Sequence, residues 1–473
     1  MEMTGDTTGR SYDSAGAMTL CENVRVLYER GDEPYRAIVA RGRELGQDVF
    51  VSVRMNDNHF YGLLPDAMPS TTVWGLTRLR KEHPDWCLTP AQVVEERGIG
   101  SWNFAYAGVR EHMLAYIAEA CEQADWDGVE IDWQRHGFYF PHADAWRLRY
   151  LLTDVMRQVR ALADGIARKR GRQFYVATRV AATVEACRQI GYDVEEWMND
   201  GLCDIVIGAG MSGTDPDFQV ERFRDMASRR SVRVYGGFDS LYRQSSGPRL
   251  KPHMQNDERR LPLTAGGYTA NFGTDRFWDE RWVRGTAQCY LERGADGIYI
   301  FNWQGTSETW RGLLTAIGSK ETLAGKDKVY AAVHGGERHF DRIFAGTPVT
   351  LYPTLTGDGP PFSVPVYDDA VGKTARNPAG IELQVDLAHF ATGDEVAVTL
   401  DGAQLPPPDV RNTAAENANN PSDVSENSWL VWKLEPGQAG YGPHEVMVRL
   451  VRRDARIKPP IVVQHVEIHV NYE

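Results

Sequence analysis

Short apolar runs alternate with amphipathic stretches along roughly the first 325 residues. The runs that predict strands, each short and rich in β-branched or aromatic residues, are residues 47–55, 128–133, 174–179, 204–209, 232–238 and 297–303. The stretches that predict helices, with apolar residues every three or four positions, are residues 110–124, 147–168, 218–230 and 282–293. Alternating strands and helices predict parallel βαβ units.

A chain of this kind can form a doubly wound sheet or a closed (β/α)8 barrel. No G-x-G-x-x-G or G-x-x-x-x-G-K-[ST] sequence follows a predicted strand, which disfavours the nucleotide-binding sheet. Residues 124–133 (ADWDGVEIDW) and 294–303 (GADGIYIFNW) are alike, and we interpret them as strands four and eight of a barrel. Strand one then has only residues 23–28 as a candidate, and strand three only residues 101–105. We predict an α/β fold with a (β/α)8 TIM barrel over residues 1–325.

The pattern changes at about residue 329, where strand-like runs separated by Gly, Pro, Asn and Asp replace the helical stretches. The predicted strands are residues 349–352, 380–387, 395–400, 429–434, 445–451 and 461–470. We therefore predict a β-sandwich accessory domain over residues 329–473, with residues 412–427 forming one long loop. We expect no catalytic residues in it.

Composition narrows the classes of partner. The 473 residues carry 52 Lys and Arg against 65 Asp and Glu, a net charge of −13, with no basic run. This charge disfavours a nucleic-acid partner. The sequence has no stretch of about 18 apolar residues, so we expect no membrane-spanning segment. Six scattered cysteines form no C-x-x-C pair, so we expect a reducing compartment, no disulfide framework and no zinc site. The N-terminus lacks a signal-peptide pattern, so we expect a soluble, cytoplasmic protein. We expect no cofactor, and the oligomeric state is open.

Polar residues gather where predicted strands end, which is where barrel enzymes place reactive side chains. The run Arg54–His59 (RMNDNH) directly follows an apolar strand. One Asn or Asp there could cap a helix, but capping does not require Arg54, Asn56, Asp57 and His59 together. We predict that this cluster belongs to an active site.

The strand at residues 128–133 places carboxylates inside the barrel. Alternation puts Glu130, Asp132 and Gln134 on the face opposite Val129 and Ile131. Such carboxylates can form a buried ion-pair layer or supply a general acid with a raised pKa. Both alternatives are open for Glu130. For Asp132, nearer the mouth, we expect the general acid, its pKa raised by Glu130.

A second reactive carboxylate is Asp57 or Asp239, and the sequence leaves the choice between them open. The Gly236–Gly237 pair before Asp239 lets a ligand approach the backbone. Arginine and asparagine bind sugar hydroxyls and tryptophan stacks on sugar rings, although any single aromatic residue can belong to the core. The expected substrate-binding residues are Arg54, Asn56, His59, Trp102, Asn103, Trp133, Gln134, Arg135, His136, Arg179, Asn302 and Trp303.

The run Asp127–Gln134 (DGVEIDWQ) resembles the D-G-x-D-x-D-x-E signature on strand four of glycoside hydrolase family 18, and Trp303 matches that family's tryptophan on strand eight. The RMNDNH element, with a C-terminal β-sandwich, resembles that of uncharacterised bacterial glycoside-hydrolase-like proteins. The resemblance implies a barrel and carbohydrate chemistry. Gln134 stands at the family's catalytic glutamate and cannot donate a proton, which implies a non-catalytic relative or a barrel family that uses other acids.

We expect a glycosidase that hydrolyses a poly- or oligosaccharide. One alternative is a barrel that binds glycans without cleaving them. Another is a polysaccharide lyase with Arg54, His59 and Arg179 around a uronate. A metal site that combines His59 and His136 with Asp57 and Asp132 is disfavoured, because no His-x-His marks a first strand.

Overall fold

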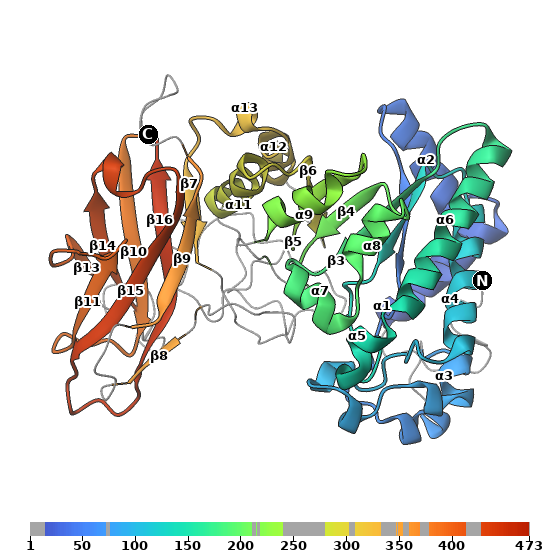
Figure 1. Cartoon of the computed structure of the whole chain (residues 1–473), viewed down its shortest axis with the longest axis horizontal. Coiled ribbons are helices and arrows are strands. Elements are labelled where there is room, and N and C mark those ends of the chain that lie inside the picture. The colour runs from blue at the N-terminus through green and yellow to red at the C-terminus, as the bar shows by residue number, and fades with distance from the viewer. Residues whose placement is uncertain are drawn as a thin grey trace.

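The computed structural model describes residues 15–71, 76–210, 214, 218–239, 280–301, 308–332, 347, 349–352, 359–368, 378–412 and 427–472. These residues form one parallel sheet and two antiparallel sheets. Figure 1 shows the parallel sheet with its helices on the right and the antiparallel strands on the left. None of the described helices is both long and apolar enough to cross a membrane.

The parallel sheet is a curled half-barrel whose six strands lie side by side in chain order. They are β1 (Phe50–Arg54), β2 (Gly128–Asp132), β3 (Tyr175–Val180), β4 (Ile205–Gly208), β5 (Arg233–Asp239) and β6 (Gly297–Phe301). All six were predicted from apolar runs. The closed barrel of eight strands remains a prediction.

The candidates for two further strands are wrong. Residues 23–28 lie in helix α1 (Ala15–Glu29), where Cys21, Val24 and Leu27 recur every three residues and are half-buried. A helical period over fifteen residues outweighs alternation over six. Residues 101–105 form no strand and contribute only an isolated bridge between Trp102 and Cys87.

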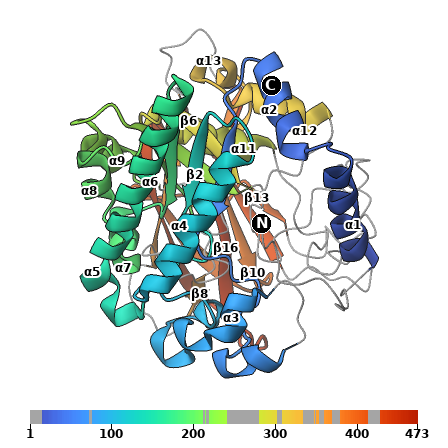
Figure 2. The same ribbon diagram turned by 90° about the vertical axis from the view of Figure 1, so that its right-hand side faces the viewer.

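Helices flank the parallel sheet (Figure 1 and Figure 2). They are α2 (Pro34–Glu44), α3 (Arg78–Glu82), α4 (Ala107–Glu122), α5 (Ala145–Leu148), α6 (Tyr150–Arg170), α7 (Val184–Ile190), α8 (Val194–Asn199), α9 (Val220–Ala227), α11 (Glu280–Glu292), α12 (Glu308–Ala316) and α13 (Lys320–Leu323). Short 3-10 turns are η1 (Pro65–Ser70), η2 (Pro84–Trp86), η3 (Pro90–Gln92), η4 (Glu96–Gly98), η5 (His142–Asp144) and η8 (Pro436–Gln438). Figure 2 shows α4 and α6 across the face of β2. Leu152, Val155, Met156 and Val159 of α6 are fully buried, the stripe that its sequence predicted.

Aspartates at the amino ends of alternate strands join neighbouring strands. Each carboxylate accepts a hydrogen bond from the backbone N–H of a residue at the start of the preceding strand. The pairs are Asp127 with Val49 (2.9 Å), Asp204 with Val176 (2.7 Å) and Asp296 with Val234 (2.8 Å). This shared role explains why residues 124–133 and 294–303 are alike: they lead into β2 and β6, four strands apart in the sheet.

The antiparallel strands form a six-stranded and a four-stranded sheet. The strands are β7 (Lys328–Ala331), β8 (Val349–Leu351), β9 (Pro361–Val366), β10 (Gly380–Ala388), β11 (Glu395–Leu400), β12 (Ala403–Gln404), β13 (Val410–Asn412), β14 (Asn427–Leu434), β15 (Gly442–Arg452) and β16 (Ile461–Asn471). One sheet has the order β13-β14-β10-β16-β7 with β8 also paired to β16, and the other the order β12-β11-β15-β9. All six strands predicted here are present. Most of the predicted loop at residues 412–427 lies outside the described residues.

Two hydrophobic clusters form the core, one drawn from residues 39–323 and the other from residues 330–470. Helix α11 meets β7 between them. A Cβ on Gly285 would stand 2.1 Å from the carbonyl oxygen of Val329, so only glycine allows this close approach. The six cysteines are free, and five are buried.

We predict that Asp204→Ala lowers the free energy of unfolding by ~1–3 kcal/mol, because the N–H of Val176 loses its acceptor in a half-buried position. Arg160 also loses a carboxylate 2.9 Å away. The matched control is Asp164→Ala, which removes only the exposed partner of the same arginine and should cost less than ~0.5 kcal/mol. Urea unfolding measures both, and equal losses would contradict the role assigned to Asp204.

Candidate active site

Three charged residues lie in register at the carboxyl ends of the first three strands. Arg54 on β1 pairs with Asp132 on β2, and Asp132 with Arg179 on β3. In-register residues of neighbouring strands point to the same face. The inner face of the sheet therefore carries a row of guanidinium, carboxylate and guanidinium.

Asp132 and Arg179 form a buried ion pair. Nη1 of Arg179 lies 2.9 Å from Oδ1 of Asp132, and each side chain is only 1% exposed. The same oxygen accepts hydrogen bonds from the backbone N–H groups of Gln134 (3.1 Å) and Arg135 (3.0 Å). Nη2 of Arg179 donates to the carbonyl oxygen of Gly210 at 2.7 Å. Several hydrogen bonds thus accompany the ion pair, as burial of two charges requires.

Glu130 lies one layer deeper on β2, in register with Ser52. Tyr299 on β6 donates a hydrogen bond of 2.9 Å to its Oε1. Glu130 is 8% exposed, and burial, followed by the charge of Asp132, raises its pKa to about 7. Ser52 is exposed beside it, so solvent reaches the inner face of β1 at this level. Glu130 is thus a carboxylic acid that retains its proton near neutral pH.

Asp57 follows β1 in a different environment. Its carboxylate accepts hydrogen bonds from Nδ1 of His59 and from Nη1 of Arg54, the latter at 3.3 Å. Burial acts to raise its pKa, but the hydrogen bond from His59 and the neighbouring positive charges outweigh burial and hold the pKa well below the usual range. Asp57 is therefore ionised, and its side chain is 39% exposed.

The two histidines adjoin this carboxylate. Nη2 of Arg135 donates to Nε2 of His59 at 3.1 Å, so a chain of hydrogen bonds runs from Arg135 through His59 to Asp57. His136 has a left-handed backbone (φ 54°), and its Nδ1 accepts from the N–H of Asn58 at 3.2 Å. Burial, followed by the charge of Arg135, lowers the pKa of His136 to about 3. His136 is therefore neutral.

Three guanidinium groups surround one aromatic ring. The Cζ atoms of Arg179, Arg135 and Arg54 lie 4.1, 5.5 and 5.6 Å from the ring centre of Phe301 on β6. Neither Phe301 nor Tyr299 was predicted from the sequence to belong to the site. The sequence feature that could have indicated their place is the alternation in Gly297–Phe301 (GIYIF), which puts both rings on one face of the strand.

Several predicted substrate-binding residues have structural contacts. Nδ2 of Asn56 donates to the carbonyl oxygens of Trp102 (2.9 Å) and Phe138 (2.5 Å), and its Oδ1 accepts from the N–H of Trp102 (2.8 Å). Asn56 thus joins two loops beside the site. Trp102 is buried under the guanidinium of Arg80, 4.9 Å from its ring centre. Oδ1 of Asn103 accepts from the N–H of Ala105 at 3.0 Å.

Trp133 and Gln134 follow directly on β2. Trp133 is 0% exposed, and its indole N–H points to Sδ of Met156 at 3.4 Å in the core. Gln134 is equally buried. Neither side chain presents a surface on which a sugar ring could stack. Asn302, Trp303 and the side chain of Asp239 lie outside the described residues.

The Gly236–Gly237 pair serves packing. A Cβ on Gly236 would stand 2.3 Å from the ring of Tyr290 on α11, and one on Gly237 would stand 2.6 Å from Cβ of Ala209. Protein atoms therefore occupy the space that we expected a ligand to approach. The two glycines therefore allow close packing of protein groups, and not the ligand contact that we expected.

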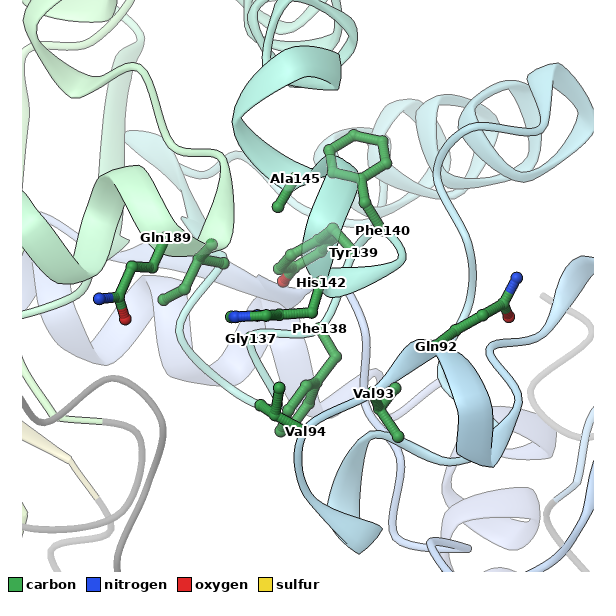
Figure 3. A pocket seen from close by; sticks show the side chains of 11 residues that line it. Gln92, Val93, Val94, Gly137, Phe138, Tyr139, Phe140, His142, Ala145 and Gln189 are labelled. Atoms are coloured by element: carbon green, nitrogen blue, oxygen red, sulfur yellow. The ribbon is translucent and has the colours of Figure 1, made fainter.

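A shallow surface hollow lies near the loop after β2. Figure 3 shows segment 137–142 with Gln92, Val93 and Val94 on one side and Gln189 on the other. The described residues that line this hollow include no Asp or Glu, so the carboxylates described above lie elsewhere. Among the described residues no group of three His, Cys, Asp or Glu is placed to hold a metal ion.

We predict that Glu130→Gln makes the protein more stable than the wild type at pH 8 but not at pH 5. With its pKa raised from 4.5 to about 7, folded Glu130 keeps a proton that the unfolded chain releases. Stability therefore falls as pH rises through this range, by roughly 3 kcal/mol. Glutamine removes the dependence.

Urea unfolding at both pH values measures this difference. The control Glu111→Gln, exposed on α4, should differ from the wild type by the same amount at pH 5 and pH 8. A difference for Glu130→Gln that does not grow with pH would contradict the raised pKa.

Comparisons with known proteins give structural neighbours only. No protein-family model and no curated protein sequence matches the chain. A family 18 N-acetylglucosaminidase from Paenibacillus barengoltzii is similar with a TM-score of 0.31 and 16% identity, over 45% of this chain and 76% of that one. A family 18 chitinase from Chromobacterium violaceum gives a TM-score of 0.27 and 12% identity, over 77% and 74%.

A family 36 α-galactosidase, AgaA, from Geobacillus stearothermophilus gives a TM-score of 0.30 and 10% identity, over 88% of this chain and 46% of that one. The chain thus spans less than half of that enzyme. These neighbours are glycoside hydrolases. Because the TM-scores and identities are low, we base the activity on the residues of the site alone.

Proposed function

We propose that the protein hydrolyses glycosidic bonds of a poly- or oligosaccharide, with Glu130 as proton donor and Asp57 as the second carboxylate. One observation carries this proposal: the environments of the two carboxyl groups shift their pKa values in opposite directions. Burial and Asp132 raise the pKa of Glu130 to about 7, whereas His59 and Arg54 overcome burial and lower that of Asp57. Such a pair provides an acid and a base at the same pH.

In the proposed reaction Glu130 gives its proton to the glycosidic oxygen as the bond from the anomeric carbon to that oxygen breaks. Tyr299 holds the carboxyl group by the hydrogen bond to Oε1. Asp57 either takes a proton from the attacking water or bonds to the anomeric carbon before water releases the sugar. His59 and Arg54 fix the orientation of its carboxylate.

Asp132 is a positioning residue in this proposal, in place of the general acid expected from the sequence. Its Oδ1 is bound by Arg179 and two backbone N–H groups, and the side chain has almost no contact with solvent. Its charge acts on the reaction through Glu130, whose pKa it raises.

The proposal includes the architecture expected from the sequence. The parallel sheet would form the wall of a (β/α)8 barrel domain over residues 1–325, and residues 329–473 a separate β-sandwich. The two hydrophobic clusters support this division. The described site residues come from β1, β2, β3 and β6 and the loops that follow β1 and β2, so the sandwich has an accessory role.

We predict that Glu130→Gln and Asp57→Asn each reduce cleavage at least ~10²-fold, the usual contribution of general acid–base catalysis. The assay incubates each variant with a broad panel of glycans and measures new reducing ends. Asp66→Asn, an exposed aspartate in η1, is the control and should retain full activity. Binding of a glycan by the wild type without cleavage over long incubation would favour the glycan-binding alternative.

Asp132→Asn separates a positioning role from an acid role. Removal of its charge should lower the pKa of Glu130, so the alkaline limb of the kcat/KM profile should move to lower pH while activity persists at acidic pH. If Asp132 were the proton donor, activity would be lost at every pH. The profile of the wild type, measured with the same glycan, provides the reference.

A further inference from the structure

We infer that the substrate is an anionic glycan, whose carboxylate or sulfate group binds to the guanidinium of Arg135 beside Arg54 and Phe301. This inference rests on the proposed function for the sugar part of the ligand. The anionic part follows from the arginines of the site, which outnumber their carboxylate partners.

Of the three arginines around Phe301, two have a carboxylate. Arg179 pairs with Asp132 and Arg54 with Asp57. Within the described part of the chain Arg135 has no ion-pair partner. Its Nη2 donates to a ring nitrogen of His59, and its buried Nε has no hydrogen-bond acceptor. A guanidinium that is half-buried and has an unused donor can bind an incoming anion.

A fourth arginine increases the excess of positive over negative side chains at the site. Arg80 is buried and donates to the carbonyl oxygen of Asp57 at 3.1 Å and to Oδ1 of Asn58 at 3.4 Å. It has no ion-pair partner among the described residues. Four guanidinium groups thus lie near only two carboxyl partners, those of Asp57 and Asp132. Like charges at short range repel, and a bound anion would relieve that repulsion.

The geometry favours a planar or tetrahedral oxyanion. The fork of an arginine matches the paired oxygens of a carboxylate or sulfate, which it can bind through two parallel hydrogen bonds. The chain as a whole carries a net charge of −13, so it should repel polyanions in general. Retention of an acidic glycan would therefore depend on this local cluster.

The test uses pairs of polymers that differ only in charge. Polygalacturonate and its fully methyl-esterified form test a carboxylate, and dextran sulfate and dextran test a sulfate. Binding is measured by calorimetry with the wild type and with Glu130→Gln, so that affinity is read apart from cleavage. We expect at least a tenfold preference for the charged member of one pair, weakened by added salt. The pair that shows the preference identifies the anion.

Arg135→Gln should abolish that preference, and Arg135→Lys should restore part of it. The control Arg147→Gln removes a cation that is exposed on α5 and should change nothing. Because Arg135→Gln relieves repulsion, its thermal unfolding midpoint should be no lower than that of the wild type, so a loss of binding cannot be attributed to unfolding. Release of ultraviolet-absorbing unsaturated ends from polygalacturonate would identify a lyase reaction on the same anionic substrate.

Equal affinity for the charged and neutral members, no binding of either polyanion, or an unchanged preference in Arg135→Gln would overturn the inference. Different results would contradict the proposed function. Charge-selective binding without any cleavage would leave the inference standing, whereas cleavage of neutral glycans alone would leave the proposed function standing.

Discussion

The candidate site depends on the ion pair between Asp132 and Arg179. Both side chains are only 1% exposed, so each charge offsets part of the cost of burying the other. The pair fixes the carboxyl end of β2 against β3, and the same carboxylate accepts two N–H groups from the start of the following loop. That loop carries Arg135 and His136. Asp132, one layer above Glu130 on β2, therefore sets the position of Arg135, the arginine that we propose to bind the substrate.

The same pair controls the acid. Asp132 raises the pKa of Glu130, while Arg179 and the hydrogen bond from Tyr299 act in the opposite direction. Burial decides the balance, and the acid keeps its proton near neutral pH. Deeper burial without these charges would raise the pKa of Glu130 further, so the acid would hold its proton too tightly to donate it. Without the charge of Asp132 the pKa would be lower, and Glu130 would lose its proton below neutral pH. The ion-pair layer and the proposed catalytic carboxyl group, which the sequence presented as alternatives for Glu130, thus lie in adjacent layers of β2.

The fold could be predicted from the sequence in segments where the apolar residues follow one clear spacing, either that of a strand or that of a helix. The six apolar runs gave the six parallel strands because strands buried on both faces are short and nearly continuous in apolar residues. The prediction of a strand at residues 23–28 was wrong because this short alternation lies inside a longer helical pattern. In the site, strand alternation placed Glu130 and Asp132 on the inner face correctly. Alternation within one strand could not show which arginine, Arg54 or Arg179, would bind Asp132, because the observed contact with Arg179 joins residues 47 positions apart.

Residue type alone does not show which of the predicted binding residues face the site. Trp102, Trp133 and Asn56 are types that bind sugars, yet they pack or join loops here, because a site at strand ends needs rigid support behind it. The rings that do contact charged groups of the site are those of Tyr299 and Phe301. They come from β6, whose apolar sequence is typical of a buried core strand.

The proposed anion and the proposed acid are coupled through Arg179. Its positive charge is one of the influences that lower the pKa of Glu130, and it shares the ring of Phe301 with Arg135. An anionic group bound to Arg135 would offset part of this positive field. The pKa of Glu130 would then rise on binding, because a nearby negative charge favours the protonated acid. By linkage, the proton on Glu130 would in turn strengthen binding of the anion. The acid would therefore be best protonated in the complex in which its proton is used.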